Sequence, residues 1–164
     1  MRICGVDPGT RTTGYGILDM HQDPERLVYV THGTIRPRSD EMALRLKEIF
    51  EGLTDMFRQF GPGEVAVETT FHSLNAQSAL KLGQARGVIL LAASLMGIPV
   101  FEYTPTEVKK ATCGYGHAGK DQIHTMVSTI LHLPKGTVRS MDASDALAIG
   151  VCHSSSRRMR RFVT

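Results

Sequence analysis

The chain has 164 residues and a mass of 18.0 kDa, a length typical of one domain. Hydrophobic residues make up 41% and charged residues 21%, a composition typical of a folded globular core and not of a disordered chain. The charge is uneven: residues 1–68 hold 8 Lys/Arg against 11 Asp/Glu, a net −3, and residues 69–164 hold 11 against 5, a net +6. The basic half favours an anionic partner, nucleic acid first, although a solvated charged surface would have the same composition.

The cysteines and the apolar runs indicate the compartment. Cys4, Cys113 and Cys152 are far apart and form no C-x-x-C pair, so neither a zinc knuckle nor a disulfide framework is predicted. The first ten residues lack an apolar signal segment, and the longest apolar stretch, residues 88–96, is about half of the ~20 residues that a bilayer span needs. We therefore expect a soluble cytoplasmic protein with small, buried thiols.

The first part of the chain predicts mainly strands. A buried strand over residues 2–7 ends at an Asp-Pro-Gly turn, and residues 14–18 and 26–35 predict two further strands in antiparallel hairpins. Apolar residues at helical spacing predict a helix over 41–60, which the following Gly-Pro-Gly ends. Residues 65–67 then predict a second buried strand, closed by the carboxylate of Glu68.

In the second part, helices dominate. A long helix over 74–96, capped by Ser73, is apolar on nearly all sides in its later half, so we expect that half to be buried against the sheet. The remaining predicted elements are a strand over 98–103, a helix over 106–112, a Gly-rich loop over 114–119, and helices over 121–133 and 142–153. Early strands followed by alternating strands and helices indicate a single α/β domain with a mixed sheet.

Four acidic residues carry the main functional signal. Asp7 and Glu68 each end an apolar strand, and ligands of α/β sheets bind outside the carboxyl ends of strands. Asp142 and Asp145 are three residues apart at a helix start, so they share one face. If that helix packs beside the strand ends, the four carboxylates converge and need a cation, and oxygen ligands favour Mg²⁺ or Mn²⁺.

Each acid also has a simpler interpretation. Asp7 before Pro-Gly is compatible with a plain turn former, and Glu68 with an ordinary charge at a strand end. Asp142 is compatible with a helix N-cap, with Asp145 interacting with the helix dipole. From spacing alone, the metal site and these simpler roles remain equally open.

Four segments resemble one known family over nearly the whole chain and in the right order. They are VDPGTRTTGYG (6–16), VETTFHSLNAQSALKLGQARG (67–87), VKKATCGYGHAGKDQI (108–123) and DASDALAIG (142–150). They resemble the RuvC family of Holliday junction resolvases, and the run NAQSALKLGQARG is highly specific. The resemblance implies an RNase H-like α/β fold with a mixed five-stranded sheet flanked by helices over residues 1–153, followed by a basic, flexible tail over 154–164.

The resemblance also implies a function. It implies a homodimer that cuts four-way DNA junctions by paired nicks during recombination and repair, in cooperation with a branch-migration helicase complex. Asp7, Glu68, Asp142 and Asp145 correspond to the family's catalytic and metal-binding carboxylates. They would hold two Mg²⁺ ions, with Mn²⁺ as a substitute, for hydrolysis by water that leaves 5′-phosphate and 3′-hydroxyl ends.

Further residues are candidates for DNA contacts. Phe71 matches a family aromatic that probes the open junction centre, whereas an isolated Phe by itself more often packs in a core. Lys109 and Lys120 match basic residues near the scissile phosphate. Lys81 and Arg86 are phosphate contacts or plain surface charges. Four arginines near the C-terminus are a loose DNA contact or a disordered tail: Arg157, Arg158, Arg160 and Arg161.

Other activities fit the sequence less well. Residues 114–121 partly match nucleotide-binding loops, but those need a preceding buried strand where a helix is predicted here. A kinase of the actin type needs two such domains, and a non-catalytic DNA-binding module would not need four acids beside DNA. An RNase H-like nuclease acting on RNA remains an open alternative. Thr10, Thr69 and Gly119 depart from the usual family pattern without removing a carboxylate.

Overall fold

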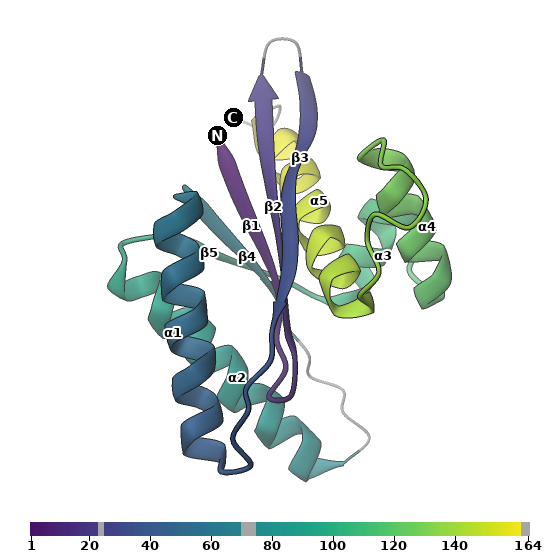
Figure 1. Cartoon of the computed structure of the whole chain (residues 1–164). Helices are drawn as coiled ribbons and strands as arrows, with labels where there is room; N and C mark the ends of the chain where they lie inside the picture. Colours follow the sequence, from purple (N-terminus) through teal and green to yellow (C-terminus); the bar gives the residue numbers. More distant parts are fainter. Residues whose placement is uncertain (23–24, 70–74, 162–164) are drawn as a thin grey trace.

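The structure is a computed structural model that describes residues 1–22, 25–69 and 75–161. Its centre is a five-stranded sheet with the order β3-β2-β1-β4-β5 (Figure 1). The strands are β1 (Arg2–Asp7), β2 (Thr13–Gln22), β3 (Glu25–Ile35), β4 (Glu64–Glu68) and β5 (Val100–Tyr103). The first three strands pair antiparallel, and β4 and β5 continue the sheet parallel to β1. The predicted mixed α/β sheet is therefore confirmed.

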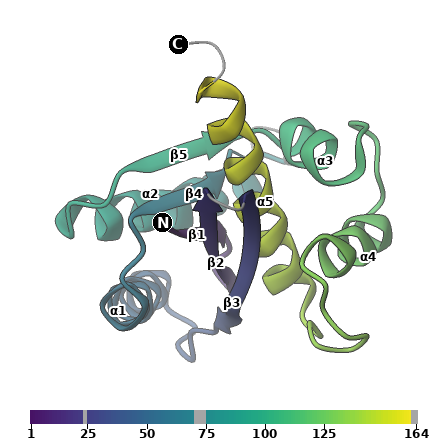
Figure 2. The same ribbon diagram turned by 90° about the horizontal axis from the view of Figure 1, so that it is seen from above.

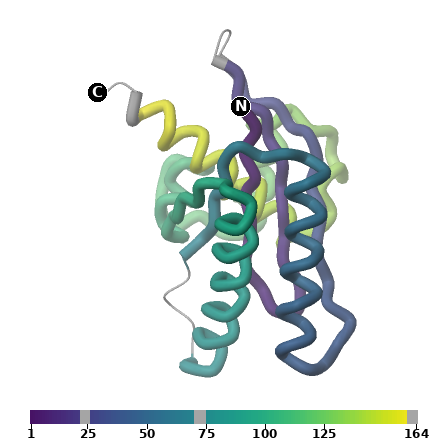
Figure 3. Tube along the Cα trace, turned by 90° about the vertical axis from the view of Figure 1, so that its left-hand side faces the viewer, coloured from purple at the N-terminus to yellow at the C-terminus, as the bar shows by residue number. Residues whose placement is uncertain are grey.

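Helices cover both faces of the sheet (Figures 1 and 2). On one face lie α1 (Met42–Phe60) and α2 (Ala76–Leu95), side by side in Figure 3. On the other face lie α3 (Pro105–Cys113), α4 (Lys120–Ile130) and α5 (Met141–Arg161), with α5 directly against the strands. Each face has its own apolar core, one around Ile49, Phe57 and Ile89 and the other around Leu147 and Val127.

Local sequence explains several helix boundaries. Gly61 ends α1 in the left-handed conformation (φ 56°), and its amide donates to the carbonyl of Phe57. Thr104 and Glu107 form a capping box at the start of α3. Asn75 caps α2 by accepting a hydrogen bond from the Ser78 amide, so the helix starts two residues later than predicted. The predicted cap, Ser73, lies outside the described residues.

Three predictions about helices were wrong. The last helix does not end at His153, because α5 continues to Arg161 and includes part of the segment expected to be a tail. The later half of α2 is not buried on all sides, since Leu91 and Leu95 are 53% and 69% exposed. The helix predicted over 121–133 is shorter, because α4 ends at Ile130.

The expectation of buried cysteines is confirmed for two of the three. Cys4 and Cys152 are buried, whereas Cys113 is only half-buried, and all three are free thiols. Helix α3 precedes the Gly-rich loop 114–119, so that loop lacks the preceding strand that nucleotide-binding motifs require. Within the described ranges, no helix combines the length and the apolar character needed to span a membrane.

Candidate active site

Asp7 and Glu68 lie at the same edge of the sheet. They are the last residues of β1 and β4, which run parallel with Val6 opposite Val67. Parallel strands in register end together, so their terminal carboxylates lie near each other at the carboxyl edge of the sheet. The apolar residues before each acid are fully buried, which anchors both strand ends in the core.

Two glycines bring α5 against these strands. A Cβ atom on Gly14 would lie 2.1 Å from the carbonyl oxygen of Asp142, and one on Gly5 would lie 2.0 Å from the carbonyl oxygen of Ala146. The helix backbone therefore rests on the backbone of β1 and β2 at a distance that only glycine permits. This close approach places the first turn of α5 beside the end of β1.

The start of α5 carries the other two acids. Ser140 caps the helix, since its hydroxyl accepts a hydrogen bond of 3.4 Å from the Ala143 amide. The simpler interpretation of Asp142 as the N-cap is therefore wrong, because Asp142 lies inside the first turn. Asp145 follows one turn later.

The charges of the other three acids act on Asp7. Burial raises the pKa of Asp7 well above its ordinary value, and the negative charges of Asp145, Glu68 and Asp142 raise it further. Burial also raises the pKa of Asp145, an effect that the ammonium group of Lys120 opposes. Such mutual repulsion is typical of acids that share a functional site.

A cleft of about 480 Å³ opens over this group. Its lining combines three of the acids, two lysines and an apolar wall: Asp7, Pro8, Glu68, Leu82, Pro105, Val108, Lys109, Ala118, Gly119, Lys120, Ile123 and Asp145. The Lys120 side chain is 77% exposed, and its Nζ lies 3.8 Å from Oδ2 of Asp145. The structure thus places Lys109 and Lys120 in the lining of the same cleft as three of the acids, with Lys120 in contact with Asp145.

The donor set fits a hard divalent cation. Four carboxylates from β1, β4 and α5 supply only oxygen ligands, which suit Mg²⁺ or Mn²⁺, and the pKa of Asp7 is raised by burial and further by the other three acids. In the part of the chain that the structure describes, no three acidic, histidine or cysteine side chains converge on one point closely enough to ligate an ion. Repulsion favours separated rotamers of these side chains, and a bound cation would offset that repulsion.

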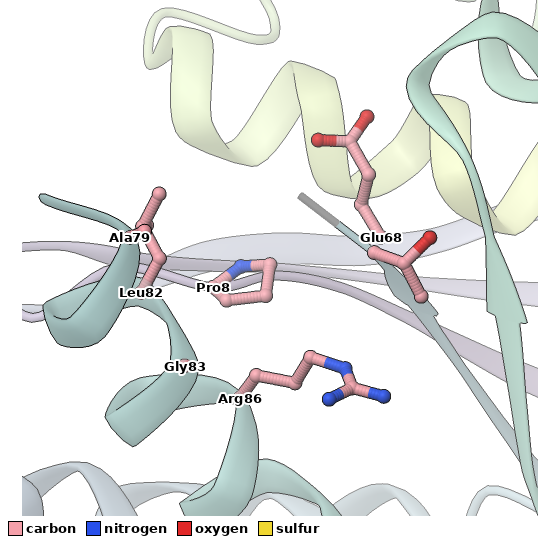
Figure 4. Close-up of a pocket in the computed structure, with 7 residues that line it drawn as sticks. Pro8, Glu68, Ala79, Leu82, Gly83 and Arg86 are labelled. Atoms are coloured by element: carbon pink, nitrogen blue, oxygen red, sulfur yellow. The ribbon is translucent and has the colours of Figure 1, made fainter. Parts of the chain in front are cut away.

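A second, smaller cavity of about 200 Å³ lies on the α2 side of Glu68. Figure 4 shows Arg86 approaching from α2 beneath Pro8, while the Glu68 side chain points away toward α5. The Nη2 atom of Arg86 lies 2.5 and 2.6 Å from the two carboxylate oxygens of Glu102 on β5. Part of the charge of Arg86 is thus already neutralised within the protein.

The other predicted DNA contacts do not line the cleft, or they lie outside the described residues. Lys81 is exposed on α2 and lines neither cavity. Phe71 lies outside the described residues. Arg157 is not part of a loose tail, since its Nη1 lies 2.7 Å from Oε1 of Glu64. Arg158, Arg160 and Arg161 also belong to α5.

Several residues that shape the site were not predicted from the sequence, because they carry no charged or reactive group. Pro8, Leu82 and Val108 line the cleft, and Gly5 and Gly14 admit α5. The glycines in the strand segments were a usable signal, because an isolated glycine in a strand often marks the close approach of another backbone. Apolar lining residues give no comparable signal in one sequence.

Comparison with known proteins places the chain in a class and then in a family. The fold is that of RNase H-like nucleases. The structure of Thermus thermophilus RuvC in complex with a Holliday junction substrate superposes on it with a TM-score of 0.89. The two chains are 33% identical, and the match covers 98% of this chain and 96% of the other. The family model for crossover junction endodeoxyribonuclease RuvC matches residues 3–153. Relatives of that name from Geobacter metallireducens and Geobacter sulfurreducens are 49% and 50% identical, covering 99% and 98% of this chain and 98% and 96% of theirs. The chain belongs to the RuvC family and is an endodeoxyribonuclease.

Proposed function

We propose that this protein resolves four-way DNA junctions during recombination and repair, by paired symmetric nicks that depend on divalent cations. The observation that carries the proposal is a cleft lined by Asp7, Glu68, Asp145 and two lysines, with Asp142 close enough to Asp7 to interact with its charge. The family membership of the chain and the junction complex of its Thermus thermophilus relative support the choice of substrate.

The proposed chemistry follows from the positions of these residues. Two Mg²⁺ ions held by Asp7, Glu68, Asp142 and Asp145 would lower the pKa of an attacking water and stabilise the leaving 3′ oxygen. The exposed ammonium group of Lys120 reaches into solvent beside Asp145, where it attracts and orients a phosphate. Lys109 adds a second positive charge on the same cleft wall. The buried strand ends fix the backbone positions of Asp7 and Glu68.

Paired nicks require two such sites, and α2 offers a surface for a second copy of the chain. Leu80, Leu91 and Leu95 are 65%, 53% and 69% exposed. Their spacing of eleven and four residues places them on one side of the helix. An exposed apolar stripe of this kind is typical of a protein–protein interface, so we propose a homodimer formed through α2. The branch-migration helicase partner and the cytoplasmic location remain predictions from the family resemblance.

The direct test is cleavage of a synthetic four-way junction with and without Mg²⁺. Linear duplex DNA and an RNA–DNA hybrid of the same sequence serve as controls. The proposal predicts nicks at symmetric positions in two opposing strands of the junction, only with the metal, and products with 5′-phosphate ends. Equal cutting of the linear duplex would contradict junction specificity, and preferred cutting of the RNA strand would favour the RNA nuclease instead.

A further inference from the structure

A buried chain of polar side chains connects α5 to the strands β4 and β5. The Tyr103 hydroxyl and His153 Nδ1 share a hydrogen bond of 2.7 Å, and His153 Nε2 lies 2.7 Å from Oε2 of Glu64. Arg157 donates from Nη1 to the other Glu64 oxygen, also at 2.7 Å. Tyr103, His153 and Glu64 are 4%, 1% and 8% exposed. We call these four residues the α5 brace.

The hydrogen bonds of the brace are mutually compatible. With the ring proton of His153 on Nε2, the Tyr103 hydroxyl donates to Nδ1 and the imidazole donates to the Glu64 carboxylate. Buried polar groups are costly unless all are satisfied, but a satisfied network fixes one arrangement of the groups that it joins. The brace therefore provides directional contacts at a position where apolar side chains would also fill the space.

The brace acts on the half of the sheet that the glycines do not reach. Gly5 and Gly14 hold α5 against β1 and β2, the half that carries Asp7, through van der Waals contact that has little directional preference. The brace ties α5 to β4 and β5, the half that carries Glu68. Tyr103 also lies opposite Glu68 in the strand register.

Tyr103 is connected to the residue after Glu68 as well. Its carbonyl accepts a hydrogen bond of 2.7 Å from the Thr69 amide and one of 3.2 Å from the Thr69 hydroxyl. One residue thus contacts both the helix that carries Asp142 and Asp145 and the chain segment that carries Glu68. This arrangement gives Thr69, a departure from the usual family pattern, a specific structural role.

Helix geometry relates the brace to the carboxylates. His153 follows Asp142 by eleven residues, which places the two on nearly the same side of the helix, about 16 Å apart along its axis. A rotation or slide of α5 at His153 therefore moves Asp142 and Asp145 relative to Glu68. A displacement of about 1 Å at reacting groups costs on the order of 100-fold in rate.

We propose that Tyr103, His153 and Glu64 are positioning residues that set the separation between Glu68 and the two carboxylates of α5. The inference rests on the proposed function, because it concerns the same metal site. It predicts that loss of the brace weakens metal binding and the chemical step, and leaves junction binding unchanged.

The test compares the wild type with His153→Leu, which removes both hydrogen bonds, and with Tyr103→Phe, which removes only one oxygen atom. Mn²⁺ affinity is measured on the full-length protein by the electron paramagnetic resonance signal of free Mn²⁺. Single-turnover junction cleavage is measured across a Mg²⁺ titration, and junction affinity by gel shift. For His153→Leu we expect about tenfold weaker Mn²⁺ binding, a rate lowered roughly 10- to 100-fold and an unchanged junction affinity. For Tyr103→Phe we expect smaller changes in the same direction.

Two further variants separate positioning from stability. Ile149→Val lies on the same helix and is buried in the apolar core, so it lowers the melting temperature and removes no hydrogen bond of the brace. It should keep wild-type Mn²⁺ affinity and rate. His153→Gln can still donate a hydrogen bond to Glu64, so it should recover part of the Mn²⁺ affinity and part of the cleavage rate.

The outcomes are distinguishable. If His153→Leu lowers only the melting temperature, as Ile149→Val does, the brace is purely structural and the proposal is wrong. If His153→Leu does not fold, Tyr103→Phe decides instead. A wild-type Mn²⁺ affinity and a wild-type cleavage rate in Tyr103→Phe would then show that the positioning proposal is wrong. If the wild type binds Mn²⁺ but does not cut junctions, the proposed function fails, whereas weaker Mn²⁺ binding in the brace variants still supports the positioning role.

Discussion

Replacing Gly14 by alanine tests whether the contact between α5 and the sheet sets the active site. The added Cβ would lie 2.1 Å from the Asp142 carbonyl oxygen and 2.4 Å from its carbon, whereas ordinary contacts begin at 3.4 Å. The first turn of α5 must therefore move away by roughly 1 Å, since both overlapping atoms are backbone. Overpacking of this kind costs about 1–3 kcal/mol of stability, and a shift of this size at the carboxylates costs on the order of 100-fold in rate.

The assay is single-turnover cleavage of a four-way junction in Mg²⁺, with junction binding and thermal melting measured in parallel. Gly63→Ala is the matched control, because Gly63 lies outside α2 and a Cβ there would meet nothing closer than 3.7 Å. That change should leave the cleavage rate unchanged. A folded Gly14→Ala protein that cuts at the wild-type rate would refute the link between this contact and catalysis.

Three further predictions concern charge and assembly. Asp7→Asn should abolish cleavage and keep junction binding. In EDTA at pH 7 it should also raise the melting temperature, because the raised pKa of Asp7 means that its ionised form destabilises the folded wild type. This gain should vanish below the ordinary pKa of 3.8, where the wild-type side chain is protonated in both the folded and the unfolded protein. Lys120→Ala should lower the cleavage rate about tenfold or more with little change in the melting temperature, since the Lys120 side chain is 77% exposed and its contact with Asp145 is long, at 3.8 Å. Lys110→Ala, which changes an exposed lysine on α3, should have little effect on either. Leu91→Glu should convert the dimer to a monomer in analytical ultracentrifugation, and a persistent dimer would place the interface elsewhere than on this side of α2.

The sheet and the acids at its edge were predictable because their signals are local. Asp7 and Glu68 directly follow short apolar runs, and such runs are typical of buried strands that end at the edge of a sheet. The three-residue spacing of Asp142 and Asp145 placed them on one face before their neighbours were known. The family resemblance, and not the spacing, assigned all four to one catalytic centre.

The unpredicted features depend on contacts between distant residues. The extension of α5 beyond His153 brings Arg157 to Glu64, 93 residues earlier in the chain, and no local pattern indicates such a partner. The apolar character of α2 indicated burial on all sides, but the sequence did not show that several of its leucines stay exposed, which depends on how the helix packs on the sheet. The hydrogen bond between Tyr103 and His153 likewise joins residues 50 apart.

The central claim is that Asp7, Glu68, Asp142 and Asp145 form one metal site that cuts DNA. Anomalous diffraction from crystals of the protein bound to a four-way junction in Mn²⁺ tests it most directly, because the anomalous peaks locate the ions independently of any activity. We expect two peaks, about 4 Å apart, within coordination distance of these four carboxylates and of the scissile phosphate. Ordered Mn²⁺ peaks elsewhere, with none at this cluster while the crystal-bound DNA is cut, would contradict it.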